Sequence, residues 1–129
     1  MANRPLSPHL SIYRFAYTMA LSILHRATGL LLTAGLILLV VFVASVAMGQ
    51  ESFAAFRAFA GSIAGRLLIC GFLIGFCYHL ANGIRHLTWD MGYGMERAQA
   101  RRSGAIVIAL TVLGAAVVVW KVFASGVAS

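Results

Sequence analysis

Long apolar runs separated by short polar segments dominate the sequence. Three stretches contain no charged residue: 27–50, 67–84 and 103–120. A helix needs about 20 mostly apolar residues to cross a hydrocarbon core of about 30 Å, whereas barrel strands form shorter, alternating segments. The pattern therefore predicts an all-α integral membrane protein with three transmembrane helices in an up-down bundle. We expect these helices to cover about 18–48, 63–90 and 103–124.

The segments between the apolar runs are short, so we expect a single transmembrane domain. An N-terminal arm over 1–17 contains both prolines of the chain, which predicts an extended entry to the first helix. After the first helix, Phe53, Phe56 and Phe59 recur at helical spacing beside Arg57. This spacing indicates a short amphipathic helix in the membrane interface, and a loop with scattered aromatic residues is the alternative.

Composition supports lipid as the surrounding solvent. The chain is 61% hydrophobic and 10% charged, whereas soluble domains carry about 25% charged residues. The net charge of +7 raises nucleic acid as a ligand, but the basic residues gather at the ends of apolar runs, as topology signals do. We therefore expect no nucleic-acid binding. Cys70 and Cys77 lie in an apolar run without a CxxC or CxxCH motif, which argues against a disulfide framework or covalently attached haem.

Basic residues near the helix ends predict the orientation. The N-terminal arm and the segment after the second helix carry more of them than the segment after the first helix: Arg4, Arg14, Arg97, Arg101 and Arg102 against Arg57 and Arg66. Positive residues favour the cytoplasmic side, so we expect a cytoplasmic N-terminus and a periplasmic C-terminus. The start of the sequence resembles neither a secretory signal nor a mitochondrial leader, which favours a bacterial inner membrane.

Polar residues within the predicted helices concentrate in the half that faces the cytoplasm. A charge near the bilayer centre costs about 2.5 kcal/mol or more, so each such residue calls for a functional explanation. They are Ser22, His25 and Arg26 in the first helix and His79, Asn82, Arg85, His86 and Asp90 in the second. The functional region is therefore expected in the cytoplasmic half of the bundle.

One stripe of the second helix carries the two histidines. His79 lies about 16 Å of helical rise from Asp90, and His86 lies about 10.5 Å closer to the surface on nearly the same face. A deep imidazole below a shallower one suits a haem standing on edge, with the deep ring on the iron and the shallower donors on the propionates. Gly75 and Gly83 would leave room for the macrocycle. The alternative is a hydrogen-bonded interior histidine beside glycines that serve helix packing.

Ser22 and Arg26 share one face of the first helix, and His25 is rotated from them by about 100°. A hydroxyl and a guanidinium can donate hydrogen bonds to a quinone carbonyl and stabilise the negative charge that develops on reduction. This indicates a quinone site. The alternative for Arg26 is a topology signal whose charge snorkels to the surface.

Three motifs together resemble a known family. RPLSPHLSIY at 4–13, SILHRATG at 22–29 and HLANGIRHLTWD at 79–90 are similar, in order and spacing, to the cytochrome b subunit of succinate dehydrogenase. The third predicted helix matches this family only in hydrophobicity.

The resemblance implies a set of cofactors and residue roles. His79 would be one axial ligand of a haem b, and a partner subunit would supply the other. His25, Arg26 and His86 would contact or neutralise the propionates, and Ser22 and Arg26 would line the ubiquinone pocket.

The resemblance also implies partners in a larger heteromeric helical bundle. They are a second hydrophobic anchor subunit, an iron–sulfur subunit and a flavoprotein subunit, which pass electrons from succinate to ubiquinone. The chain itself contains no flavin fingerprint and no cysteine cluster, so it is expected to be a subunit that cannot oxidise succinate alone.

Three other functions stay open from sequence. The same architecture could anchor a quinol:fumarate reductase, since reduction potentials depend on partners. A small proton-coupled transporter could use His79 and Asp90 as a relay, and a structural anchor could lack haem. We further expect His25 to lie too near the cytoplasmic surface to share a haem axis with His79.

Overall fold

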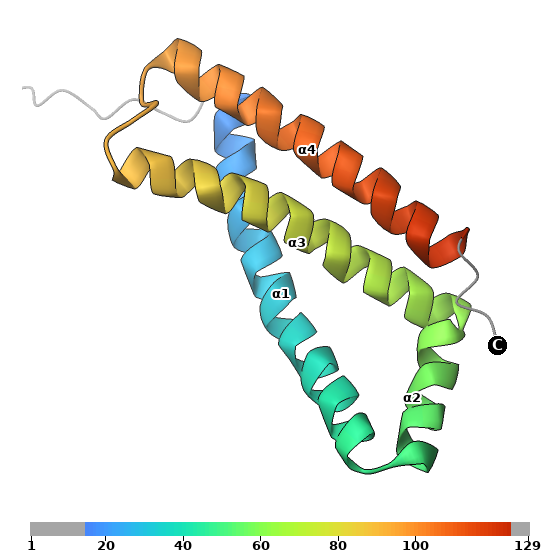
Figure 1. Cartoon of the computed structure of the whole chain (residues 1–129). Helices are drawn as coiled ribbons and strands as arrows, with labels where there is room; N and C mark the ends of the chain where they lie inside the picture. The colour runs from blue at the N-terminus through green and yellow to red at the C-terminus, as the bar shows by residue number, and fades with distance from the viewer. Residues whose placement is uncertain (1–14, 125–129) are drawn as a thin grey trace, which may run out of the picture.

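The computed structural model describes residues 15–124. In chain order its helices are α1 (Tyr17–Ala47), α2 (Gln50–Gly61), α3 (Ile63–Asp90) and α4 (Arg97–Phe123) (Figure 1). Helices α1, α3 and α4 are long and apolar enough to cross a membrane, and within the described residues there is no strand. The predicted all-α membrane fold with three spanning helices is therefore confirmed.

The start of the last spanning helix differs from the prediction. Helix α4 begins at Arg97, not near 103. The prediction placed the start at the edge of the charge-free run, but a helix continues beyond the hydrocarbon wherever its residues favour it. Ala98, Gln99 and Ala100 are strong helix formers, so the polar segment extends the helix by six residues. The predicted N-terminal arm lies almost entirely outside the described residues.

The segment after α1 is the amphipathic helix α2, and the loop alternative is wrong. Phe53 and Phe56 face α1, where their ring centroids lie 6.4 and 5.4 Å from that of Phe42. Ser62 then caps α3 by accepting a hydrogen bond from the backbone N–H of Gly65 at 3.1 Å. A Cβ atom at Gly65 would lie 2.1 Å from the carbonyl oxygen of Phe59, so this sharp junction between α2 and α3 requires glycine.

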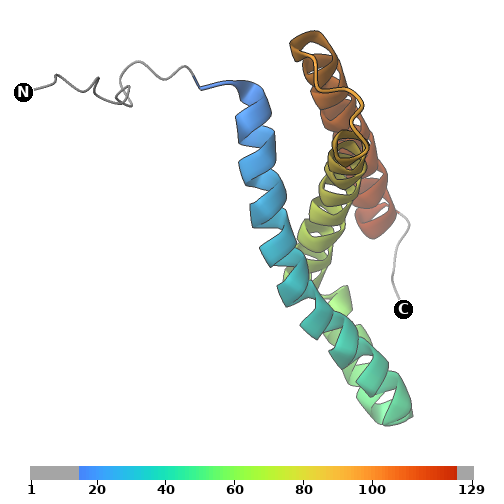
Figure 2. The ribbon, with the colours of Figure 1, turned by 90° about the vertical axis from the view of Figure 1, so that its left-hand side faces the viewer.

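Helix α3 is the centre of the fold. It runs antiparallel to both α1 and α4, while α1 and α4 diverge from their contact near Tyr17 (Figures 1 and 2). A small buried cluster of Leu21, Tyr78 and Val107 joins the three helices at this end.

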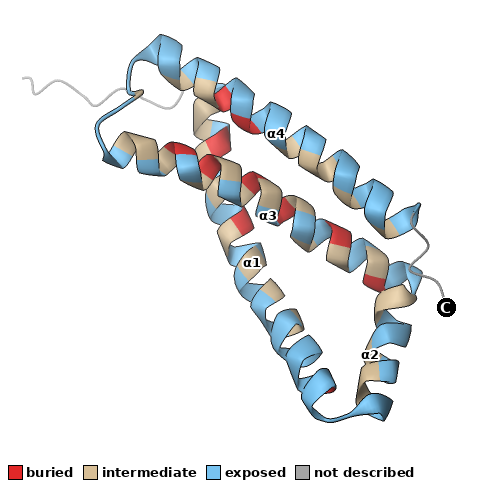
Figure 3. Ribbon diagram, in the orientation of Figure 1, coloured by how far each residue is buried: buried red, intermediate tan, exposed pale blue. Residues whose placement is uncertain are grey.

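Most of the helix surface is exposed (Figure 3), and many large apolar side chains lie on it. Leu30, for example, is 76% exposed. Apolar surface of this extent requires lipid or another hydrophobic chain around it. The fold therefore provides few internal contacts and large faces for an environment outside the chain.

Candidate functional site

Three imidazole rings from two helices meet at the end of the bundle opposite α2. The His25 ring of α1 stacks on the His79 ring of α3, with centroids 3.9 Å apart and planes 14° apart. The His86 ring lies 5.0 Å from His25, tilted by 36°, and packs edge-on against Trp89 at 5.2 Å. The fold thus assembles the three histidines that the sequence singled out.

The expected difference in depth between His25 and His79 is wrong. About 12 Å of helical rise separates His25 from the start of α1, against about 16 Å between His79 and the end of α3. The C-terminal end of α3 reaches further outward than the N-terminal end of α1. The two rings therefore meet at one level. Face-to-face rings direct their nitrogens sideways and not at a common point, so this pair does not form a bis-histidine site. Within residues 15–124, no group of three or more His, Cys, Asp or Glu is placed to hold a metal ion.

Hydrogen bonds fix the tautomer of His79. Its Nδ1 lies 3.1 Å from the carbonyl oxygen of His25 and 3.2 Å from Oγ1 of Thr28. A carbonyl oxygen only accepts hydrogen bonds, so Nδ1 carries the proton. In a neutral imidazole the other nitrogen, Nε2, then keeps its lone pair, which is the arrangement of a histidine that binds a metal.

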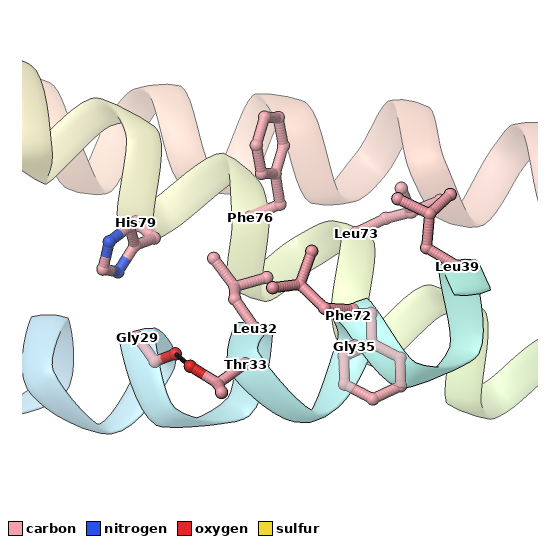
Figure 4. A pocket seen from close by; sticks show the side chains of 10 residues that line it. Gly29, Leu32, Thr33, Gly35, Leu39, Phe72, Leu73, Phe76 and His79 are labelled. Carbon is pink, nitrogen blue, oxygen red and sulfur yellow. Dashed lines mark hydrogen bonds between the residues drawn. The ribbon is translucent and has the colours of Figure 1, made fainter.

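A groove opens beside His79 between α1 and α3 (Figure 4). Its volume is about 490 Å³, within the range of sites for organic ligands. Apart from His79 and Thr33, every lining residue is apolar or glycine: Gly29, Leu32, Gly35, Leu36, Leu39, Phe72, Leu73 and Phe76.

Glycine lets the helices approach closely around this groove. A Cβ atom at Gly29 would lie 3.1 Å from Cε1 of His79, so a larger residue would push the ring. The glycines that the sequence singled out on α3 instead contact α1. Gly75 faces Leu31 and Gly83 faces His25, as in the helix-packing alternative.

The Nδ1 atom of His25 is buried, and among the described residues it has no hydrogen-bond partner. A buried polar atom without a partner costs about 1–3 kcal/mol. A polar group from outside the described residues, such as a ligand or a partner subunit, would remove this cost.

Ser22 and Arg26 lie one turn apart on α1, before and after His25. Ser22 is half-buried and Arg26 is exposed. Neither is among the residues that line the groove beside His79. Arg26 thus lies on the outer surface of α1, next to His25 in sequence, and Ser22 is partly covered one turn earlier.

The structure also shows a buried polar network that the sequence analysis left without a role. Arg85 is 3% exposed. Its guanidinium donates to Ser103 Oγ at 3.0 Å, the Ala100 carbonyl at 3.1 Å and Asn82 Oδ1 at 3.2 Å, and it covers the Trp89 ring at 4.0 Å. This network joins the C-terminal end of α3 to the N-terminal end of α4.

Tyr78 and Asn82 join the same face of α3 to α1. The Tyr78 hydroxyl donates to the Leu21 carbonyl at 2.5 Å, and the Asn82 amide donates to the same oxygen at 3.5 Å. Tyr78, Asn82 and Arg85 stand at i, i+4 and i+7, a spacing that the sequence displays and that predicts one shared face.

Replacing Arg85 with Leu is expected to lower the stability of the anchor. The change removes three hydrogen bonds that a buried guanidinium donates, and hydrogen bonds to charged groups contribute about 1.5–3 kcal/mol each. We expect the stability of the folded anchor to fall by about 3 kcal/mol or more. In detergent, the variant complex should aggregate at a lower temperature than the wild type. Arg102→Leu, on the exposed side of α4, is the control and should change this temperature little. Equal shifts in both variants would contradict a role for the network.

Comparison with known proteins agrees with the motifs. The model of the succinate dehydrogenase/fumarate reductase transmembrane subunit family matches residues 1–118. The cytochrome b560 subunit of mitochondrial succinate dehydrogenase from Bos taurus is 46% identical over 116 residues, covering 86% of this chain and 67% of the relative. The corresponding Sus scrofa subunit is 43% identical over 117 residues, covering 87% and 68%.

A bacterial relative matches over more of its own length. The succinate dehydrogenase cytochrome b556 subunit of Paracoccus denitrificans is 38% identical over 111 residues, covering 86% of this chain and 85% of the relative. The resemblance inferred from the three motifs is thereby confirmed. The chain belongs to the succinate dehydrogenase/fumarate reductase transmembrane subunit family.

Proposed function

We propose that this chain is the haem b-binding membrane anchor of a succinate dehydrogenase, and that it helps to form the site where ubiquinone is reduced. The observation that carries the proposal is the state of His79: its Nδ1–H is held by the His25 carbonyl, and its Nε2, to which no described residue is hydrogen-bonded, keeps a lone pair for iron beside an apolar groove. Family membership makes the chain a non-catalytic subunit of an enzyme complex. It also argues against the transporter interpretation.

The residues present fit a haem. His79 would supply one axial ligand through Nε2, and a histidine of the second hydrophobic subunit would supply the other. His25, Arg26 and His86 would hold the propionates, and the unpartnered Nδ1 of His25 supports this role. The bound group would supply a one-electron redox couple close to the quinone. The name cytochrome b, which the relatives carry, supports the same cofactor.

For the quinone site we propose Ser22 and Arg26. Both can donate hydrogen bonds to a quinone carbonyl, and the Arg26 charge would stabilise the negative charge that develops on the oxygen. Arg26 is exposed and Ser22 is only half-buried one turn away on α1, so a quinone could reach both from the lipid or from a partner subunit.

The proposed partners are a second hydrophobic anchor subunit, an iron–sulfur subunit and a flavoprotein subunit. The large apolar faces of α1 and α4 support the first of these, because a second helical subunit could cover them. The proposed direction of catalysis is from succinate to ubiquinone. The family also includes fumarate reductase subunits, whereas the relatives described above are succinate dehydrogenase subunits.

Purification of the complex in mild detergent tests this function. The chain should co-purify with the three partners, and succinate should reduce a haem with a b-type difference spectrum. A complex that contains the chain but no haem would contradict the proposal and favour a purely structural anchor.

We further propose a bacterial inner membrane with the N-terminus and the 91–96 loop in the cytoplasm. The distribution of arginines supports this orientation, and the relative from Paracoccus denitrificans supports the bacterial setting. In intact cells, a membrane-impermeant maleimide should label Arg57→Cys in α2, whereas Arg102→Cys in α4 should react only after permeabilisation. Labelling of residue 102 in intact cells would reverse the proposed topology.

A further inference from the structure

Thr28 of α1 contacts the ring nitrogen of His79 that faces away from the proposed iron site. The side chain is buried, and its Oγ1 lies 3.2 Å from Nδ1 of His79. The same oxygen lies 2.9 Å from the Leu24 carbonyl and 3.0 Å from the His25 carbonyl. The hydroxyl is thus shared between its own helix and the histidine of α3.

The positions of the protons give this contact a direction. A threonine hydroxyl has one proton and two lone pairs. Its proton is used by one of the two carbonyls of α1, which only accept. Since Nδ1 of His79 carries a proton that points toward the His25 carbonyl and Thr28, the lone pair of Oγ1 is its second acceptor.

We infer that Thr28 is a positioning residue that, together with the His25 carbonyl, fixes the His79 ring and strengthens Nε2 as an electron donor. An acceptor on the outer N–H of a ligating histidine selects its tautomer, orients its ring and raises its basicity. The inference rests on the proposed haem ligation by His79 and extends it to a second residue, whose hydroxyl adjusts the reduction potential of the bound group.

Two other threonines in these spans help to isolate this role. The hydroxyl of Thr33 donates to the Gly29 carbonyl at 3.0 Å, and that of Thr111 donates to the Val107 carbonyl at 2.8 Å. Both hydroxyls bond back onto their own helix. Thr111 lies on α4, so Thr111→Val provides a matched control that removes a helix-bonded hydroxyl without touching His79.

The experiment is a redox titration of the assembled complex, followed by haem absorption, for Thr28→Val, Thr28→Ala, Thr28→Ser and Thr111→Val. Valine keeps nearly the shape of threonine and removes the acceptor, while serine keeps the hydroxyl. With a weaker donor on the iron, the reduced form is favoured. In Thr28→Val we expect about a tenfold change in the oxidised-to-reduced ratio at a fixed ambient potential, a size taken from the smaller effects that such residues have on metal affinity. For a one-electron couple this equals an upward shift of about 59 mV.

Thr28→Ala should shift the potential in the same direction, whereas Thr28→Ser and Thr111→Val should keep the wild-type value. Loss of low-spin haem from the Val and Ala variants, with retention in the Ser variant, would also support the inference, because only the hydroxyl distinguishes them. A wild-type potential in Thr28→Val or Thr28→Ala, or the same defect in Thr28→Ser, would overturn it. Persistence of the low-spin spectrum in a His79→Gln complex would instead overturn the proposed ligation.

Discussion

A complex that carries His79→Gln is expected to lose its low-spin haem spectrum. Low-spin haem needs strong-field ligands, and the proposed one from this chain is Nε2 of His79, to which no residue of 15–124 is hydrogen-bonded. Glutamine keeps a polar side chain of similar length but has no imidazole lone pair. We expect haem that is absent or high-spin, measured by the redox difference spectrum of the purified complex.

His86→Gln is the matched control for this variant. His86 lies on the same helix, seven residues away, and its ring contacts His25 and Trp89. If its role is to hold a propionate, the His86 variant should retain a low-spin spectrum and bind haem less tightly. A His79 variant with an unchanged low-spin spectrum, together with a His86 variant that loses it, would mean that His86 and not His79 is the haem ligand.

The spanning helices could be predicted from the sequence because lipid imposes a length and an apolar composition on each of them. The start of α4 could not, because Arg97–Arg102 continue the helix into a polar environment where hydropathy gives no signal. The helical spacing of Phe53, Phe56 and Phe59 indicated α2, but a loop stayed open as the alternative until the structure showed the helix, with two of these rings packed near Phe42.

The candidate site was predictable as a set of residues and not as an arrangement. Helical spacing put His79 and His86 on one stripe, yet the level at which α1 crosses α3 depends on contacts between helices, such as Gly83 against His25. The His25 and His79 rings stack because the two helices cross at this level. The role of Thr28 was hidden for the same reason, because its contact with His79 joins residues 51 positions apart.

Ser22→Ala and Arg26→Leu are expected to reduce electron transfer to ubiquinone by about 10²–10³-fold, the usual effect of removing one donor to a developing negative charge, or about 2.7–4 kcal/mol. Oxidation of succinate by a soluble dye should stay close to wild type, because the proposed flavin site lies in another subunit. The ratio of the two activities, measured on the purified complex, therefore reports on the quinone site alone. Ser45→Ala is the control for Ser22, since Ser45 lies near the opposite end of α1 and donates to the Phe42 carbonyl at 2.7 Å.

Arg26→Lys separates the two interpretations of Arg26. As a topology signal with a snorkelling charge, the residue should tolerate lysine, because the charge and the long apolar stem are kept. As a quinone donor it should not, because an ammonium group lacks the planar array of N–H donors of a guanidinium. We expect the lysine variant to assemble with normal dye reduction and a reduced rate with ubiquinone. Full ubiquinone reduction in Arg26→Lys would leave Arg26 as a topology signal, and equal losses in both assays would assign Ser22 and Arg26 to assembly of the complex.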